Sequence, residues 1–345
     1  MSFLPTQQAL QYEEALKREA ESWAAPSDYG SIPIATEEEV PVIDVGPFLR
    51  ANSDLEETAR QIRDACRSTG FFYIVNHLVS PELIDKTFQV TRWFHDLPQE
   101  IKMRYEMGST AQPPGVGYLS LNNYKLPARA KGNVNESFIV KREVGPRNIT
   151  LDRMPWPQSG NPTEDATFRD TILRYLEEME SLSQRMLPLY AVALGLSSDY
   201  FQGAFKDALF RFRMTHYPPV SNYEDSQYGI GPHVDTSFFT ILASSSMGLV
   251  VHSKRTNGWV MVGAREGCLV VNTGQLLQQI TNDSWMAVKH LALNAESVPR
   301  YSLTFFLNAN PTSKMPVVPT CVSENNPAKY PPASYLEGQG VAQGE

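Results

Sequence analysis

Three side chains in the second half of the chain have the types and order of a metal-binding set. His233 and Asp235 lie two positions apart in the run Gly-Pro-His-Val-Asp at 231–235, and His290 follows far downstream. Residues two apart on a β-strand project to the same side, so a strand would direct His233 and Asp235 together. Two imidazoles and one carboxylate leave three metal positions open, which is the ligand set of open non-haem Fe(II) sites. Zinc accepts the same ligands, so the residue types leave both metals open.

A second polar group follows the distal histidine. Four residues of a strand expected at 300–308 alternate and share one face: Arg300, Ser302, Thr304 and Phe306. Arginine can bind a carboxylate through two parallel hydrogen bonds, and a hydroxyl two positions on can donate to the same group. A His-x-Asp motif alone arises often by chance. Its combination with a distal histidine and Arg-x-Ser indicates a metal centre beside a carboxylate clamp.

The strand expected at 208–217 has one apolar and one polar face. Arg213, Thr215 and Tyr217 alternate on the polar face, which we expect to line the same pocket. Tyr217 would donate its hydroxyl to the acid held by the clamp, and Arg213 would anchor an acidic or carbonyl-bearing substrate. The alternative is that this face is simply solvated. Further candidates for an apolar pocket wall, each with core packing as the alternative, are Phe306, Tyr118, Phe138 and Met247.

The composition excludes several classes of protein. The 345 residues are 42% hydrophobic with a net charge of -8, which is typical of a globular chain, and no Lys/Arg cluster is long enough to follow a nucleic-acid backbone. The N-terminus has no secretory signal, and no apolar stretch reaches the roughly 18–20 residues of a membrane span. Three widely spaced cysteines favour a reduced compartment. We therefore expect a cytoplasmic protein that acts on a small molecule, without nucleic acid or membrane.

Hydrophobic periodicity predicts a helical first half and a strand-rich second half. The helices are expected at 6–25, 53–68, 80–94 and 164–195, and the strands at 40–43, 71–75, 136–141, 208–217, 237–243, 248–252, 258–262, 268–271 and 300–308. This order favours an α+β fold with a closed or sandwiched antiparallel core. The predicted parts are an N-terminal helical extension at 1–39, a mixed α/β region at 40–160, a long helix plus catalytic core at 161–311, and an irregular lid or tail at 312–345.

Several motifs resemble the isopenicillin N synthase-like branch of the 2-oxoglutarate/Fe(II)-dependent oxygenases, over about residues 40 to 310. The segments that carry this resemblance are Val-Pro-Val-Ile-Asp at 40–44, Gly-Phe-Phe-Tyr-Ile-Val-Asn-His at 70–77, Trp-Phe-His-Asp-Leu-Pro at 93–98, Gly-Tyr at 117–118, Glu-Ser-Phe at 136–138, Trp-Pro at 156–157, Asn-Thr-Gly at 272–274, Leu277 and Thr-Asn at 281–282. The chain departs from the family pattern at Leu78, Thr215 and Gln275. None of these departures removes a metal ligand.

The resemblance implies a double-stranded β-helix (jelly roll) core with surrounding helices. It implies Fe(II) at His233, Asp235 and His290. It also implies 2-oxoglutarate bound by Arg300, Ser302 and Tyr217, with dioxygen as the second co-substrate. The reaction would be a hydroxylation, a desaturation or an oxidative ring formation or rearrangement, in specialised metabolism. The other histidines are expected in packing or capping roles rather than at the metal: His77, His95, His216 and His252.

Three alternatives remain open at the level of sequence. One is an Fe(II) oxidase of the isopenicillin N synthase type, which uses no 2-oxo acid and whose clamp would hold a substrate carboxylate. The second is a zinc hydrolase or lyase on a cupin-like barrel. The third is a non-catalytic ligand sensor, although such a protein would be expected to have lost a ligand. Metal analysis separates iron from zinc, and succinate release separates the two oxidative classes; the oligomeric state stays open.

Overall fold

The computed structural model describes residues 30, 32–109, 112–121, 132–144, 147–221, 227–332 and 334, and the strands in these ranges form two sheets. The larger sheet has the order β1-β2-β10-β7-β12-β5-β4-β3: Val42–Asp44, Phe71–Val75, Cys268–Thr273, Phe239–Ser244, Arg300–Asn308, Leu209–Tyr217, Glu136–Arg142 and Gly117–Leu119. The smaller sheet has the order β6-β11-β8-β9: Ile230–His233, His290–Ala292, Leu249–Ser253 and Gly258–Val262. All neighbours pair antiparallel except β1 and β2.

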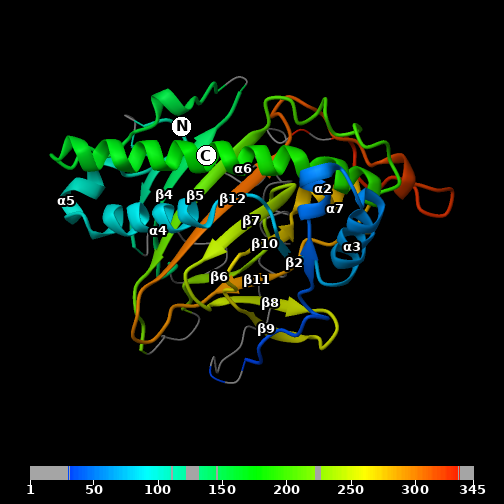
Figure 1. Cartoon of the computed structure of the whole chain (residues 1–345), viewed down its shortest axis with the longest axis horizontal. Helices are drawn as coiled ribbons and strands as arrows, with labels where there is room; N and C mark the ends of the chain where they lie inside the picture. The colour runs from blue at the N-terminus through cyan, green and yellow to red at the C-terminus, as the bar shows by residue number, and fades with distance from the viewer. Residues whose placement is uncertain are drawn as a thin grey trace, which may run out of the picture.

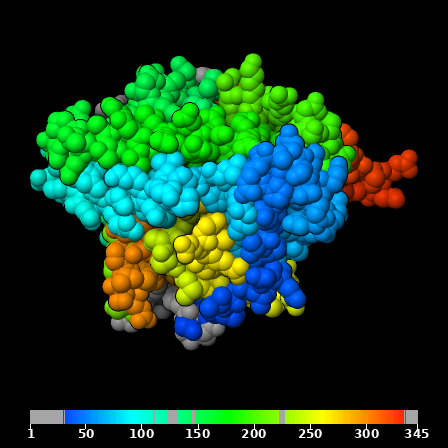
Figure 2. All heavy atoms as spheres, viewed as in Figure 1, coloured from blue at the N-terminus to red at the C-terminus, as the bar shows by residue number. Residues whose placement is uncertain are grey.

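Helices cover one face of the larger sheet (Figure 1). The described helices are α2 Gly46–Ala51, α3 Leu55–Ser68, α4 Pro81–Asp96, α5 Gln99–Lys102, α6 Pro162–Ala193 and α7 Gln275–Ile280, with short 3-10 turns at Met103–Tyr105, Leu151–Arg153 and Pro319–Cys321. The long α6 contacts both α3 and α4, and in Figure 2 α6 and α4 form two adjacent bands across the molecule. Among the described helices, none combines the length and apolar character needed to cross a membrane.

The strand β5 shows why the helices pack on that face. Phe210, Phe212 and Met214 are buried in the core that includes α3, α4 and α6, and the ring of Phe212 lies 5.2 Å from that of Tyr175 on α6. The alternate residues of β5 face the opposite side of the sheet. The predicted division of this strand into an apolar outer face and a polar inner face is confirmed.

A second apolar cluster lies between the two sheets. It joins Leu242 of β7 and Val270 of β10 to Leu249 and Val251 of β8. The sheets therefore face each other as two layers with side chains between them, as in a sandwich or flattened barrel. This cluster leaves room for a polar pocket in the same interlayer space, as described below.

Most of the predicted elements are confirmed. The strand predicted at 71–75 is β2, the helix predicted at 164–195 is α6, and the Oγ of Ser80 caps α4 by accepting a hydrogen bond from the N–H of Leu83 at 3.2 Å. The strands β3, β6 and β11 and the helices α2, α5 and α7 were not predicted. The helix expected at 6–25 lies outside the described residues. The four-part division of the chain stays a prediction, although one apolar core joins α3 and α4 to α6 across its boundary at 160.

Gly274 lies at a close contact that holds the loop after β6. Its N–H donates to the carbonyl of Phe238 at 3.1 Å, and the next N–H, of Gln275, donates to the carbonyl of Asp235 at 2.8 Å. A Cβ atom at position 274 would overlap with the carbonyl oxygen of Ser237. The glycine is therefore required by space, since its φ of -108° is open to any residue.

We expect Gly274→Ala to lower the free energy of unfolding by about 1–3 kcal/mol, because overpacking forces the backbone to shift. The shift would displace Asp235, so metal affinity should fall as well. Urea denaturation and metal titration measure the two effects. Gly203→Ala is the matched control, because a Cβ there meets nothing within 4 Å. Equal behaviour of the two variants would contradict the role of Gly274.

Candidate metal centre and its pocket

Two neighbouring strands of the smaller sheet bring the two predicted histidines together. His233 ends β6 and pairs directly with His290, which begins β11. Their ring centroids are 4.2 Å apart. The Nδ1 atom of His233 is 2.9 Å from the carbonyl oxygen of Gly231, and that of His290 is 3.0 Å from that of Val288. A proton on each Nδ1 would make these hydrogen bonds and leave both Nε2 lone pairs free to bind a metal.

Asp235 completes this group from the loop after β6. Its Oδ1 lies 3.7 Å from the Nε2 of His233 and 3.6 Å from the Nε2 of His290. The side chains of Asp235 and His233 converge as predicted, but alternation along one strand is not the cause, because β6 ends at His233. The carboxylate is aimed instead by two donors to its other oxygen, Oδ2: Thr240 at 2.7 Å and Asn272 at 2.8 Å.

The protonation states of this group suit a divalent metal. Burial and the neighbouring His290 lower the pKa of His233 to about 3, so its imidazole is neutral near pH 7. Burial raises the pKa of Asp235, but the two imidazoles and the hydrogen bonds from Asn272 and Thr240 outweigh it, and the net pKa is lowered. Neutral imidazoles and an ionised carboxylate are the forms that bind metal. The set fits Fe(II) with three positions left open, and zinc accepts the same donors.

Arg300 lies beside this group with an unused donor. It is the first residue of β12 and pairs with Tyr217, the last of β5, and its guanidinium lies 4.5 Å from the centroid of the tyrosine ring. Arg300 is 1% exposed, and its Nη2 donates to the Oγ of Ser244 at 2.7 Å. Its buried Nη1 has no hydrogen-bond partner in the described part of the chain. A buried cation with an unused N–H favours an anionic ligand at this place.

One pocket contains both the three metal-ligand candidates and the clamp. It is lined by Arg213, Thr215, Tyr217, Ile230, His233, Asp235, Thr240, Leu242, Leu249, Asn272, His290, Leu291, Ala292, Arg300, Ser302, Thr304 and Phe306. The larger sheet supplies β5, β7, β10 and β12 to the pocket, and the smaller sheet supplies β6, β8 and β11. Of the residues predicted for the substrate, Arg213 and Phe306 are here. Arg213 is oriented by hydrogen bonds at 2.8 Å from Nε to the Oγ of Ser137 and from Nη2 to the Oδ1 of Asn135.

Three residues predicted for the pocket wall lie elsewhere. Phe138 pairs with Met214 and Tyr118 pairs with Phe138, so both share the outer, helix-covered face of the larger sheet. Phe138 packs on Phe94 with ring centroids 4.6 Å apart. Met247 is 51% exposed between β7 and β8 and does not line the pocket. These three predictions are corrected, because the pairing of β3, β4 and β5 decides which face each residue occupies.

The residues that orient the metal-ligand candidates and the two arginines were not predicted from the sequence. Thr240 and Asn272 hold Asp235, Ser244 holds Arg300, and Asn135 with Ser137 holds Arg213. The Asn-Thr-Gly run at 272–274 was a signal for Asn272, since a polar residue at the end of an apolar strand calls for a partner. No comparable local signal marked Thr240 or Ser244.

Comparisons with known proteins agree with this site. The family model for the N-terminal region of the non-haem dioxygenase in morphine synthesis matches residues 40–159. The family model for the 2OG-Fe(II) oxygenase superfamily matches residues 207–309. Jasmonate-induced oxygenase 2 of Arabidopsis thaliana is 30% identical over 315 residues, which cover 90% of this chain and 80% of the relative. The chain belongs to the 2OG-Fe(II) oxygenase superfamily. It is an oxidoreductase that uses Fe(II) and 2-oxoglutarate, and its predicted class is confirmed.

Further relatives and solved structures support the same conclusion. The 2-oxoglutarate-Fe(II) type oxidoreductase hxnY of Emericella nidulans is 27% identical, with 85% of this chain and 86% of the relative covered. A full-length Neurospora crassa protein, solved in complex with alpha-KG, has a TM-score of 0.76 at 26% identity, with 90% of this chain and 97% of that chain covered. The structure of JOX2 in complex with 2OG, Fe and JA has a TM-score of 0.74 at 26% identity, with 96% and 92% covered. The predicted double-stranded β-helix core with surrounding helices is confirmed.

We expect Asn272→Ala and Thr240→Val each to weaken metal binding about 10–100-fold, because each removes a hydrogen bond that aims the Asp235 carboxylate. Titration of the metal-free protein with Fe(II) in the absence of dioxygen measures this effect. Thr304→Val is the matched control, since Thr304 lines the same pocket and makes no hydrogen bond to Asp235. In the double variant the two losses of metal affinity should not add, because Thr240 and Asn272 both donate to the Oδ2 of Asp235. Unchanged affinity in both single variants would contradict this account of Asp235.

Proposed function

We propose that His233, Asp235 and His290 bind the Fe(II), and that Arg300, Ser302 and Tyr217 bind the distal carboxylate of 2-oxoglutarate. The observation that carries this assignment is the unused Nη1 of the buried Arg300 in the same pocket as the three ligand candidates. A divalent ion with one carboxylate ligand keeps a net positive charge, which favours an anionic chelator beside it. Iron with 2-oxoglutarate and dioxygen supplies the oxidising chemistry that removes a hydrogen atom from the substrate.

The chain's own residues orient the reactants and exclude water. The two Nδ1 contacts fix the imidazoles, and Thr240 and Asn272 fix the carboxylate. Arg300 and Tyr217, which pair across β12 and β5, hold the acid at a set distance from the metal ligands. Apolar side chains such as Leu242 and Leu291 line the same pocket and limit the access of water. Oriented groups in a water-poor pocket lower the barrier without taking part in bond changes themselves.

We further propose that the substrate is a small molecule with an acidic or carbonyl group, anchored by Arg213 and packed against Phe306. Both side chains line the pocket, and the two hydrogen bonds to Asn135 and Ser137 set the direction of the guanidinium. Relatives named for jasmonate and azadirone support a role in specialised metabolism. The net charge of -8 argues against a nucleic-acid partner, and the three widely spaced cysteines favour a reduced compartment such as the cytosol.

Arg300→Ala should raise the KM for 2-oxoglutarate at least about 30-fold. Removal of one partner from a buried arginine–carboxylate pair costs about 2 kcal/mol or more of binding free energy. Succinate release in the presence of Fe(II) measures this change. Arg300→Lys is the control for charge, since it keeps the cation and loses the paired hydrogen bonds, and we expect an intermediate KM. Turnover of wild type without succinate would contradict the use of 2-oxoglutarate and favour the oxidase type that needs no 2-oxo acid.

Arg213→Met should separate substrate binding from co-substrate binding. With a substrate found by screening acidic and carbonyl-bearing metabolites, we expect its KM to rise about tenfold or more, as for one lost charge-assisted hydrogen bond. The KM for 2-oxoglutarate should stay near the wild-type value. A variant that processes the substrate with unchanged KM would show that Arg213 is not the anchor.

A further inference from the structure

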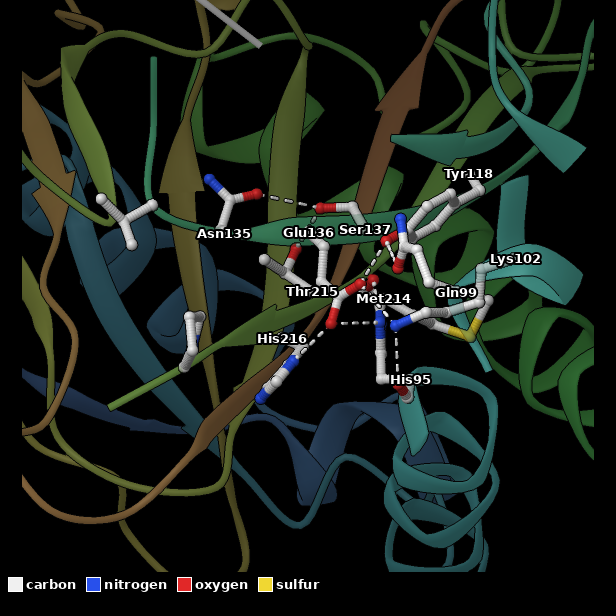
Figure 3. Close-up of polar contacts among 12 residues, drawn as sticks. His95, Gln99, Lys102, Tyr118, Asn135, Glu136, Ser137, Met214, Thr215 and His216 are labelled. Atoms are coloured by element: carbon white, nitrogen blue, oxygen red, sulfur yellow. Dashed lines mark hydrogen bonds and ion pairs between the residues drawn. The ribbon is translucent and has the colours of Figure 1, made fainter. Parts of the chain in front are cut away.

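A buried polar network centred on Glu136 lies on the helix-covered face of the larger sheet (Figure 3). The Oε1 of Glu136 accepts a hydrogen bond from the Nδ1 of His216 at 2.7 Å, and Oε2 is 2.9 Å from the Nζ of Lys102. The hydroxyl of Tyr118 also donates to Oε2. The Nδ1 of His95 lies 3.6 Å from Oε1, and the Nζ of Lys102 also donates to the carbonyl of His95 at 2.8 Å.

Two histidines and a carboxylate also suggest a second metal site, but the charges argue against one. The side chain of Lys102 is only 8% exposed, and its ammonium already neutralises Glu136. A divalent ion between His95, His216 and Glu136 would lie close to this buried cation, where repulsion in a low dielectric is strong. Burial, the largest effect, lowers the pKa of His95, so Lys102 rather than this imidazole supplies the positive charge beside Glu136. Lys102 is the cation of the network, while the buried Nδ1 of His95 has no hydrogen-bond partner among the described residues.

The position of the network in the sheet gives it another role. Glu136 of β4 pairs with His216 of β5, which pairs with Tyr301 of β12. These three residues, which we call the backing row, cross three adjacent strands on the outer face. Their side chains touch in sequence: His216 bonds to Glu136 and stacks on Tyr301, with ring centroids 4.9 Å apart and planes at 15°.

Each member of the backing row lies between two residues that act in the pocket on the inner face. Glu136 is flanked by Asn135 and Ser137, which orient Arg213. His216 is flanked by Thr215 and Tyr217, and Tyr301 by Arg300 and Ser302, all of which line the pocket. Since successive side chains alternate across a strand, any shift of a backing-row residue along its strand moves both of its pocket neighbours.

We propose that the backing row is a positioning device for the 2-oxoglutarate clamp and for Arg213. His216 is its central member, because it joins the ionic network of β4 to the aromatic stack of β12. Lys102 and His95 fasten the row to α4 and α5, which do not reach the pocket. The network fixes the relative register of β4, β5 and β12 beside the clamp residues Arg300, Ser302 and Tyr217. A clamp whose residues are held less firmly binds a carboxylate less well. This inference rests on the proposed function of Arg300, Ser302 and Tyr217.

Substitutions at His216 test the device without leaving Lys102 unpaired. His216→Phe keeps the stack on Tyr301 and loses the hydrogen bond to Glu136, whose carboxylate retains Lys102 and Tyr118. His216→Asn places an amide N–H near the site of the imidazole Nδ1 and is the conservative rescue. Binding of 2-oxoglutarate to the Fe(II)-loaded enzyme without dioxygen is measured by calorimetry, alongside the unfolding temperature, kcat and KM.

We expect His216→Phe to bind 2-oxoglutarate about tenfold more weakly, the size of one lost hydrogen bond, with kcat at saturating 2-oxoglutarate nearly unchanged. His216→Asn, which restores the hydrogen bond and loses the stack on Tyr301, should recover part of the affinity. Phe138→Leu is the matched control, because Phe138 is on the same strand and face as Glu136 but outside the backing row. It should lower the unfolding temperature and leave the dissociation constant for 2-oxoglutarate at the wild-type value.

Three outcomes would overturn the inference. The first is His216→Phe binding within about twofold of wild type, which is less than one net hydrogen bond contributes. The second is an equal loss of affinity in Phe138→Leu, which would reduce the row to general stability. The third is a second metal equivalent that is lost in His95→Gln, which would make the cluster a cation site. A wild type that binds iron and no 2-oxoglutarate would instead refute the proposed function, and the inference with it.

Discussion

The ionised carboxylate of Asp235, buried beside two imidazoles, is the constraint on which the site depends. An isolated buried carboxylate costs several kcal/mol of solvation, so it persists only where donors and positive charge surround it. Thr240 and Asn272 supply the donors from β7 and β10, and the imidazoles shift its pKa downward. The two sheets must therefore meet at a defined spacing, because the histidines come from the smaller sheet and the supporting donors from the larger one.

The larger sheet serves two environments at once. Its inner face carries the clamp, Arg213 and the donors to Asp235, while its outer face carries the apolar core under α3, α4 and α6. The backing row interrupts this apolar core with a polar strip, and Arg142 of β4, paired with Glu180 of α6, is a second polar group on the same face. A buried ion pair in an apolar layer favours the arrangement of strands that keeps Lys102 beside Glu136, because any other would leave charges unpaired. The polar groups on the two faces are thus linked through shared strands.

Sequence patterns predicted the elements whose periodicity is long and regular. β5 and β12 alternate over nine residues each, so the two sides of both strands, and with them Arg300, Ser302, Tyr217 and Arg213, followed from the sequence alone. β6 contains Gly231 and Pro232, which favour turns, and β11 has three residues, so the strands that carry the histidines gave no periodic signal. Phe138 and Tyr118 were candidates for the pocket wall or for core packing, and the sequence could not decide between these because the pairing of β4 with β5 depends on contacts between distant segments. The network around Glu136 joins several separate elements and has no local signature.

The place of β6 in the smaller sheet links the stability of this layer to the metal. Among the described strands β6 pairs only with β11 and so forms one edge of the smaller sheet, and the N–H of Gly231 donates outside this sheet to the Oδ1 of Asn133 at 2.9 Å. A short edge strand opens locally at a lower free-energy cost than unfolding of the whole protein. His233 lies on this edge strand, and His290 lies on the neighbouring strand β11. An iron ion held by His233, Asp235 and His290 would join β6 to β11 and to the loop after β6, and would thereby stabilise this edge of the smaller sheet.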